Sequence, residues 1–124
     1  MKKVLTLITV LLLIGCKTNQ TINGQRHGKW ISQTITENDT LKYIEKYKKG
    51  IEVKTWKTYK NRKLIKKEKY KNQICIVTNY YPNKKIESQG TTKSQLEGKY
   101  LHWFYSGIWK YYDINGNLIE TKTF

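Results

Sequence analysis

From Gln25 onward the chain is a succession of short runs in which apolar or aromatic residues alternate with polar ones. A period of two places alternate side chains on opposite faces of a β-strand, and the β-branched and aromatic residues in these runs favour strands. The clearest runs are residues 40–47, 51–55, 64–70 and 74–80. No segment shows a convincing helical period, so this pattern predicts a mainly β fold.

The runs are separated by residues that favour hairpin turns. These breaks lie at residues 48–50, 60–63, 71–73, 82–84 and 115–116. Asn115 and Gly116 predict a type I′ turn, in which both central residues have positive φ. Strands joined in this way form an antiparallel meander of successive β-hairpins.

The chain also repeats itself. Residues 59–64 (YKNRKL) match residues 81–86 (YPNKKI) after 22 residues, and residues 47–51 (YKKGI) match residues 70–74 (YKNQI). A period near 22 accommodates two strands and two turns, which is one hairpin per repeat. A lone hairpin is marginally stable in water, whereas stacked hairpins share one continuous face.

Two phrases at the ends of this region resemble MORN-repeat-variant proteins, whose bacterial members are often labelled YwqK-type antitoxins. Residues 24–30 (GQRHGKW) resemble the family's G-x-x-x-G-x-W phrase, and residues 109–120 (WKYYDINGNLIE) resemble its W-x-x-Y-x-x-N-G-x-L phrase. The resemblance covers roughly residues 24–124. It implies a curved, mostly antiparallel sheet of hairpins and no catalytic residues.

The middle of the chain departs from that family pattern. Lys54 stands where the family has the glycine before a tryptophan, and Arg62 and Lys84 stand at turn glycine positions. Residues 90–99 (GTTKSQLEGK) are expected to form a longer loop that interrupts the period.

The first sixteen residues resemble a bacterial lipoprotein signal peptide. Two lysines precede an apolar run over residues 4–14, which is too short to span a bilayer, and Leu13-Ile14-Gly15-Cys16 resembles a lipobox. The resemblance implies cleavage between Gly15 and Cys16 and acylation of Cys16; the alternative is an ordinary secretory signal with a chance cysteine. We expect a signal peptide at 1–15, a lipidated cysteine and polar tether at 16–24, and a MORN-like β-repeat domain at 25–124.

The lipid anchor implies attachment to a membrane in the bacterial cell envelope. Lys17 is not an aspartate, so by resemblance to enterobacterial sorting the outer membrane is favoured over the inner membrane. With Cys16 acylated, Cys75 has no cysteine partner, and its setting between Ile74 and Ile76 indicates a small buried residue.

Candidate chemistry in the rest of the chain is sparse. His27 and His102 are the only histidines, and neither belongs to a recognisable metal-binding or nucleophile-activating arrangement. The acidic residues are scattered, and no glycine-rich phosphate loop is present. We therefore expect no catalytic residues, no metal and no cofactor.

Two groups of residues are candidates for binding. One is an aromatic surface, which would take a sugar, peptidoglycan or a protein unless these rings serve core packing: Trp103, Tyr105, Trp109 and Tyr111. The other is a basic face within residues 42–71, where thirteen Lys or Arg accompany three Asp or Glu: Lys57, Lys60, Lys63, Lys66, Lys67 and Lys69.

The formal charge of +15 suggests an anionic partner, but its composition argues against nucleic acid. The chain has 22 lysines and 2 arginines, whereas bidentate phosphate and guanine recognition favours arginine. Its richness in Lys, Ile, Asn and Tyr is also what an AT-rich genome produces. The alternatives left are a solvated lysine face that protects strand edges, and attraction to anionic lipid headgroups or glycans.

Together these features predict a non-enzymatic, membrane-anchored lipoprotein whose sheet is a binding or scaffold module for a protein or an anionic envelope component. The alternative is an antitoxin or immunity protein that neutralises a toxin by protein–protein binding. An enzyme acting on cell wall or lipid would need a cleft with convergent carboxylates or histidines. The sequence does not determine the oligomeric state.

Overall fold

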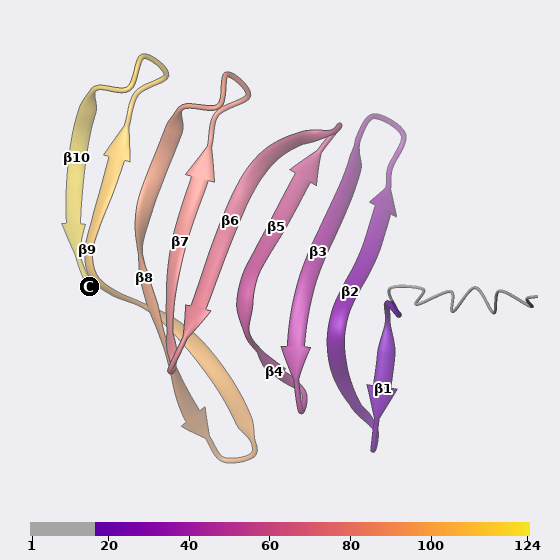
Figure 1. Ribbon diagram of the computed structural model, residues 1–124. Helices are drawn as coiled ribbons and strands as arrows, with labels where there is room; N and C mark the ends of the chain where they lie inside the picture. The colour runs from indigo at the N-terminus through magenta and orange to yellow at the C-terminus, as the bar shows by residue number, and fades with distance from the viewer. Residues whose placement is uncertain (1–16) are drawn as a thin grey trace, which may run out of the picture.

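The computed structural model describes residues 17–124, and over this range the protein is one open antiparallel sheet of ten strands (Figure 1). The predicted mainly β meander is therefore confirmed. The strands follow the sequence in the order β1-β2-β3-β5-β6-β7-β8-β9-β10, and the short β4 lies off this path and pairs with β3. The strands are β1 (Gln20–Ile22), β2 (Gln25–Ile35), β3 (Thr40–Lys48), β4 (Ile51–Glu52), β5 (Lys54–Lys60), β6 (Lys63–Lys71), β7 (Ile74–Tyr80), β8 (Ile86–Glu97), β9 (Tyr100–Tyr112) and β10 (Leu118–Thr123).

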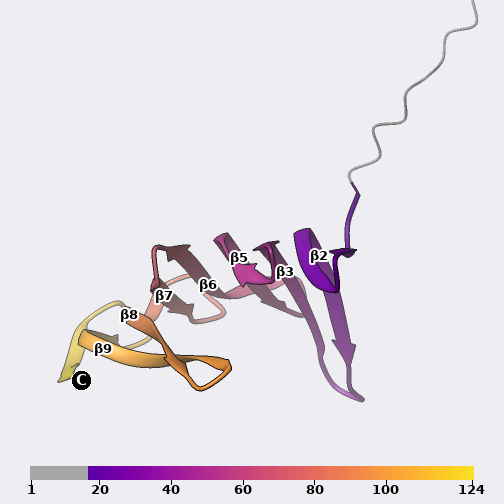
Figure 2. The same ribbon diagram turned by 90° about the horizontal axis from the view of Figure 1, so that it is seen from below.

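Seen from below, the sheet is a single curved layer, and no helix or second sheet formed by residues 17–124 packs on it (Figure 2). β1 and β10 lie at its two opposite edges (Figure 1). In a layer of this kind an apolar side chain can be buried only against side chains of neighbouring strands, on the concave side of the sheet.

One face of the sheet carries a row of interlocked aromatic rings. Ring centroids lie 6.3 Å apart for Trp30 and Tyr47, 4.9 Å for Tyr47 and Trp56, 4.9 Å for Trp56 and Tyr70, and 5.1 Å for Tyr70 and Trp103. The contact between Tyr70 on β6 and Trp103 on β9 spans two intervening strands, so the sheet bends toward this side. We call this side, defined by these five residues, the aromatic face.

The small core lies on the aromatic face of β7 to β9. Cys75, Val77 and Trp109 are its buried apolar residues, with Tyr70 and Trp103 among the rings packed around them. Residues that pair directly across the strands share a face, and the pairs Tyr70 with Cys75 and Ser94 with Trp103 place these groups together.

Trp109 is buried because Gly90 has no side chain. A Cβ at Gly90 would lie 2.2 Å from the Trp109 ring, so the indole rests directly on the β8 backbone. Its Nε1 donates to the Thr91 carbonyl at 2.9 Å, which satisfies the buried N–H. The indoles of Trp30 and Trp56 likewise donate to backbone carbonyls.

The residue two positions before each of these tryptophans has a left-handed backbone. Gly28 has φ of 72°, Lys54 of 61° and Gly107 of 66°. Arg62 and Lys84, the other two residues that stand at expected glycine positions, have φ of 69° and 70°. The glycine-like conformation is therefore kept where the glycine itself is absent, at a cost of about 1–2 kcal/mol per side chain.

Three local expectations were wrong. Residues 17–24 are not a free tether, because Gln20–Ile22 pairs with β2 as β1. Residues 90–99 do not form a long loop; they continue β8 and turn at Gly98 into β9. The 115–116 turn is not type I′, because only Gly116 has positive φ (92°), and its N–H donates to the Asp113 carbonyl at 3.0 Å.

Two of these corrections have a local physical cause. The side chain of Asp113 accepts hydrogen bonds from the backbone N–H groups of Asn115 and Asn117, which favours a three-residue loop over residues 114–116 in place of a two-residue loop. In residues 90–99, threonines and the alternating Leu96 favour a strand, and one glycine is needed beside Trp109 rather than for a loop.

The strained backbone at Lys54 gives a direct test. We expect Lys54→Gly to raise the free energy of unfolding by roughly 0.5–1 kcal/mol, because glycine adopts positive φ without steric cost. The control is Thr55→Gly on the same strand, whose φ is not positive; it should lower stability by at least a similar amount. Urea unfolding followed by tryptophan fluorescence measures both, and a Lys54→Gly variant less stable than wild type contradicts the strain.

Candidate binding surface

Lysines are concentrated on the side of the sheet opposite the aromatic face. The strand register pairs Lys29 directly with Lys46, and Lys57 directly with Lys67. Like charges opposed in this way repel across about 5 Å. We call this side the lysine face, which is defined in strands β2 to β6 by Lys29, Lys42, Lys46, Lys57, Lys67, Lys69 and Lys71.

The carboxylates of the same strands lie on the aromatic face. Glu45 is paired with Trp30, Glu52 with Tyr47 and Glu68 with Trp56.

Two of these carboxylates, Glu45 and Glu68, form ion pairs on their own side of the sheet. Lys66 Nζ lies 3.1 Å from Glu68 Oε1, and Arg26 Nη1 lies 3.7 Å from Glu45 Oε2. Within residues 17–124, no residue of the lysine face takes part in a salt bridge. The lysine face therefore carries an uncompensated positive charge.

The predicted basic face is split between the two sides. Lys57, Lys67 and Lys69 belong to the lysine face. The remaining three fall at positions of the aromatic face: Lys60, Lys63 and Lys66. Grouping all six as one face was wrong, because successive side chains of a strand point to opposite sides. In addition, Ile65 is an extra residue in β6, and this bulge moves Lys63 to the side opposite Lys67 and Lys69.

Sequence reasoning missed the part of the lysine face on β2 and β3. Lys42 and Lys46 alternate with Tyr43 and Glu45 along β3. The period of two therefore already places the two lysines on one face and the tyrosine and glutamate on the other. Lys29 could be placed opposite Lys46 only once the register of β2 and β3 was known.

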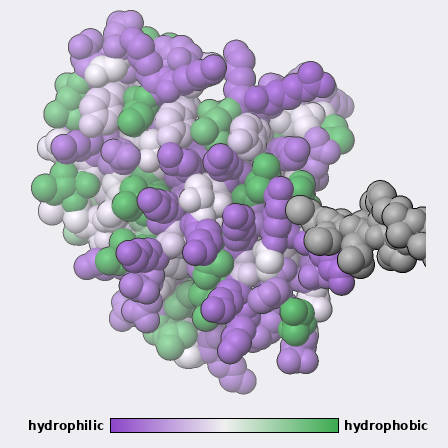
Figure 3. Space-filling view, in the orientation of Figure 1, coloured by the Kyte–Doolittle hydropathy of each residue, from purple (hydrophilic) through white to green (hydrophobic). Residues whose placement is uncertain are grey.

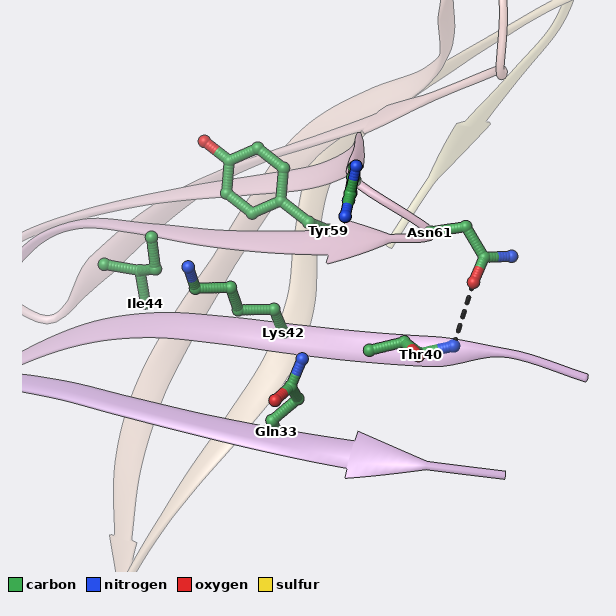
Figure 4. Close-up of a pocket in the computed structure, with 7 residues that line it drawn as sticks. Gln33, Thr40, Lys42, Ile44, Tyr59 and Asn61 are labelled. Carbon is green, nitrogen blue, oxygen red and sulfur yellow. Dashed lines mark hydrogen bonds between the residues drawn. The ribbon is translucent and has the colours of Figure 1, made fainter. Parts of the chain in front are cut away.

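A hollow of about 660 Å³ lies on the lysine face, near the turns that end the β2–β3 and β5–β6 hairpins (Figure 4). Lys42 and Arg62 supply positive charge to it, and Gln33 and Tyr59 supply an amide and a hydroxyl. Asn61 fixes its rim, since its Oδ1 accepts a hydrogen bond of 2.9 Å from the Thr40 N–H. These groups suit a negatively charged, oxygen-rich ligand.

The surface seen in Figure 3 is dominated by hydrophilic residues, with hydrophobic residues scattered between them in small patches. A surface of this kind favours contact through charge and hydrogen bonds rather than through one apolar pocket.

The predicted aromatic surface is mostly core. Trp109 is only 2% exposed, which rules it out as a surface contact, and Trp103 and Tyr111 pack against the buried cluster. Tyr105 alone of the four is well exposed, at 56%, and its ring lies 5.2 Å from that of Phe124. These rings are used for packing because a single-layer sheet has few other large apolar groups to fill its concave side.

Cys75 is buried as expected, at 1% exposure. Burial, together with the nearby negative charge of Glu68, raises the pKa of its thiol to about 11, so the thiol is protonated at neutral pH.

The two histidines lie apart from Cys75 in the fold. His27 lies on β2 and His102 on β9, where its Nε2 is 3.8 Å from Glu97 Oε2. Over residues 17–124 no group of three or more His, Cys, Asp or Glu side chains is placed to hold a metal ion.

No family model, curated protein or solved structure matches this chain. The resemblance to MORN-repeat-variant proteins therefore stays a prediction. Among the described residues there is no helix of the length and apolarity that crossing a bilayer requires.

The opposed lysines are predicted to lower the stability of the fold. We expect Lys57→Gln to raise the free energy of unfolding by roughly 0.2–0.5 kcal/mol, because it removes the repulsion with Lys67. The gain should shrink at 1 M salt, where the Debye length is about 3 Å. In the control, Lys66→Gln removes the ion pair with Glu68 and should give no gain. Thermal unfolding at low and high salt measures both variants.

Proposed function

We propose that this protein is a non-enzymatic binding module, anchored to a membrane of the bacterial cell envelope through a lipid on Cys16. In this proposal the lysine face binds an anionic component of the envelope. The observation that carries it is the pairing of lysines across neighbouring strands with no carboxylate beside them. Such repulsion destabilises the free protein and is relieved when a polyanion covers the face.

Anionic lipid headgroups fit this surface best. Each lysine close to an anionic membrane contributes about 1 kcal/mol of attraction, so a face of several lysines gives binding that is strong at low salt and weak at high salt. The hollow that holds Lys42 and Arg62 adds two cations and two neutral hydrogen-bonding groups, which suits a phosphate-bearing headgroup. Glycans with acidic groups share this chemistry.

The position of β1 supports action close to a membrane. Cys16 lies outside the described residues, but Gln20 already begins β1. Four residues of extended chain reach at most about 14 Å, so a lipid on Cys16 would hold the sheet near the headgroups. Electrostatic attraction acts over about 8–10 Å at physiological salt, which is a comparable distance.

An antitoxin or immunity protein is the second candidate. The feature that favours it is the exposed aromatic pair of Tyr105 and Phe124, since aromatic residues dominate the energetics of protein interfaces. On this alternative the partner is a protein. Tyr105→Ala should then abolish binding of that protein while leaving vesicle binding unchanged.

The two faces allow a charge-matched test of lipid binding. A chain beginning at residue 17 is mixed with phosphatidylglycerol or phosphatidylcholine vesicles, and bound protein is measured by sedimentation. We expect Lys57→Gln, Lys67→Gln and Lys69→Gln together to weaken binding to phosphatidylglycerol by at least tenfold. The control replaces Lys60, Lys63 and Lys66 by Gln, which removes the same charge from the aromatic face. Equal losses in both triple variants contradict a role for the lysine face.

The lipid anchor is tested separately in cells. We expect wild-type protein to incorporate labelled palmitate and to fractionate with membranes, with globomycin blocking its processing. Cys16→Ala should abolish the labelling, whereas Cys75→Ala should leave it intact. Unchanged labelling and fractionation of Cys16→Ala would refute the anchor without bearing on the lysine face.

A further inference from the structure

The two edges of the sheet differ in how they are covered. Near β1, Asn19 lies against the outer edge of β2: its Nδ2 donates to the Ile31 carbonyl at 2.9 Å, and its Oδ1 accepts from the Ile31 N–H at 2.7 Å. The outer edge of β10 has no strand partner among residues 17–124. All six residues of β10 are exposed, and Ile119 is 64% exposed.

An uncovered strand edge presents unpaired N–H and C=O groups to any strand that can align with it. A bulge in the pairing with β9 lies between Leu118 and Glu120, so the regular part of β10 is Glu120–Thr123. This part contains no proline and carries one negative and one positive side chain, Glu120 and Lys122. Both belong to the aromatic face, where they oppose Tyr111 and Trp109.

The order of these two charges makes β10 complementary to itself. Two copies that pair antiparallel are related by a two-fold axis perpendicular to the sheet, so each residue must oppose one on the same face. When the axis passes through Thr121, Glu120 of each copy opposes Lys122 of the other. An axis through Glu120 or Lys122 instead opposes like charges, which is destabilising. Of these three registers, only the one centred on Thr121 opposes unlike charges.

We propose that β10 pairs antiparallel with β10 of a second copy of this chain, centred on Thr121. Glu120 and Lys122 already form a salt bridge inside each copy, so pairing exchanges these two intramolecular ion pairs for two ion pairs between the copies. Within one copy they lie 3.8 Å apart, and each side chain is about half exposed, at 53% and 52%. Pairing joins two ten-stranded sheets into one continuous sheet through backbone hydrogen bonds flanked by two ion pairs.

This symmetry keeps corresponding faces on the same side. The lysine faces of both copies point in one direction, and so do the aromatic faces. The pairing stands independently of lipid binding, because no residue of the lysine face takes part in it. If both proposals hold, the dimer doubles the charged surface that one membrane can meet.

Charge swaps test the pairing in cells that produce two differently tagged copies of the full chain. We expect co-purification of the wild-type copies to fall at least fivefold when both carry Glu120→Lys, or both carry Lys122→Glu, because each change opposes like charges. The double variant with both changes should recover co-purification. A Glu120→Lys copy and a Lys122→Glu copy should also recover each other. Failure of both recoveries overturns the proposal.

A cysteine placed at the axis provides a second measurement. Thr121 opposes its own copy at a Cα separation of about 4.5–5.5 Å, which a disulfide can span. We expect Thr121→Cys to give a cross-linked dimer on mild oxidation, and the cross-link to disappear when Glu120→Lys is added. Thr21→Cys on the opposite edge is the control. No dimer with Thr121→Cys, or an equal yield with Thr21→Cys, overturns the proposal.

Discussion

Everything in this sheet depends on how a single layer obtains a core. A second layer normally covers one face of a sheet, and here a row of rings replaces it. Each ring of the aromatic face packs on the ring of a nearby strand, and such pairs contribute about 0.5–1.5 kcal/mol beyond their burial. The row reaches from Trp30 on β2 to Trp103 on β9, so it links strands that are far apart in the sheet. Gly90 completes it by giving Trp109 a flat backbone to rest on.

The commitment of one face to rings decides where charge can go. Alternation in a strand leaves every second side chain on the far side, and lysine occupies seven of these places on β2 to β6: Lys29, Lys42, Lys46, Lys57, Lys67, Lys69 and Lys71. The few carboxylates remain among the rings, where Glu45 accepts a hydrogen bond from Tyr47 Oη. Burial and this neighbouring carboxylate raise the pKa of Tyr47 to about 12, so its hydroxyl stays a donor. The segregation of charge is thus a consequence of the same period that builds the core.

The sequence predicts the meander well, because hairpin turns and alternation are local signals. It also locates three departures from a glycine pattern, at Lys54, Arg62 and Lys84, and each keeps positive φ. It predicts the surfaces less well. Which lysines share a face depends on register, and a bulge at Ile65 of β6, opposite Thr58 and Tyr59, shifts that register. The burial of Trp109 depends on Gly90, nineteen residues earlier, and no local pattern connects the two.

Two of the carboxylates hold turns of the sheet. Hydrogen bonds from Asn61, followed by contact with Lys60, lower the pKa of Asp39, and backbone and side-chain hydrogen bonds from Asn117 lower that of Asp113. Both carboxylates are therefore held ionised at turns, where they fix hairpin ends. An open meander does not close on itself, so both of its faces and the outer edge of β10 stay exposed. Lysines add positive charge to one of these faces.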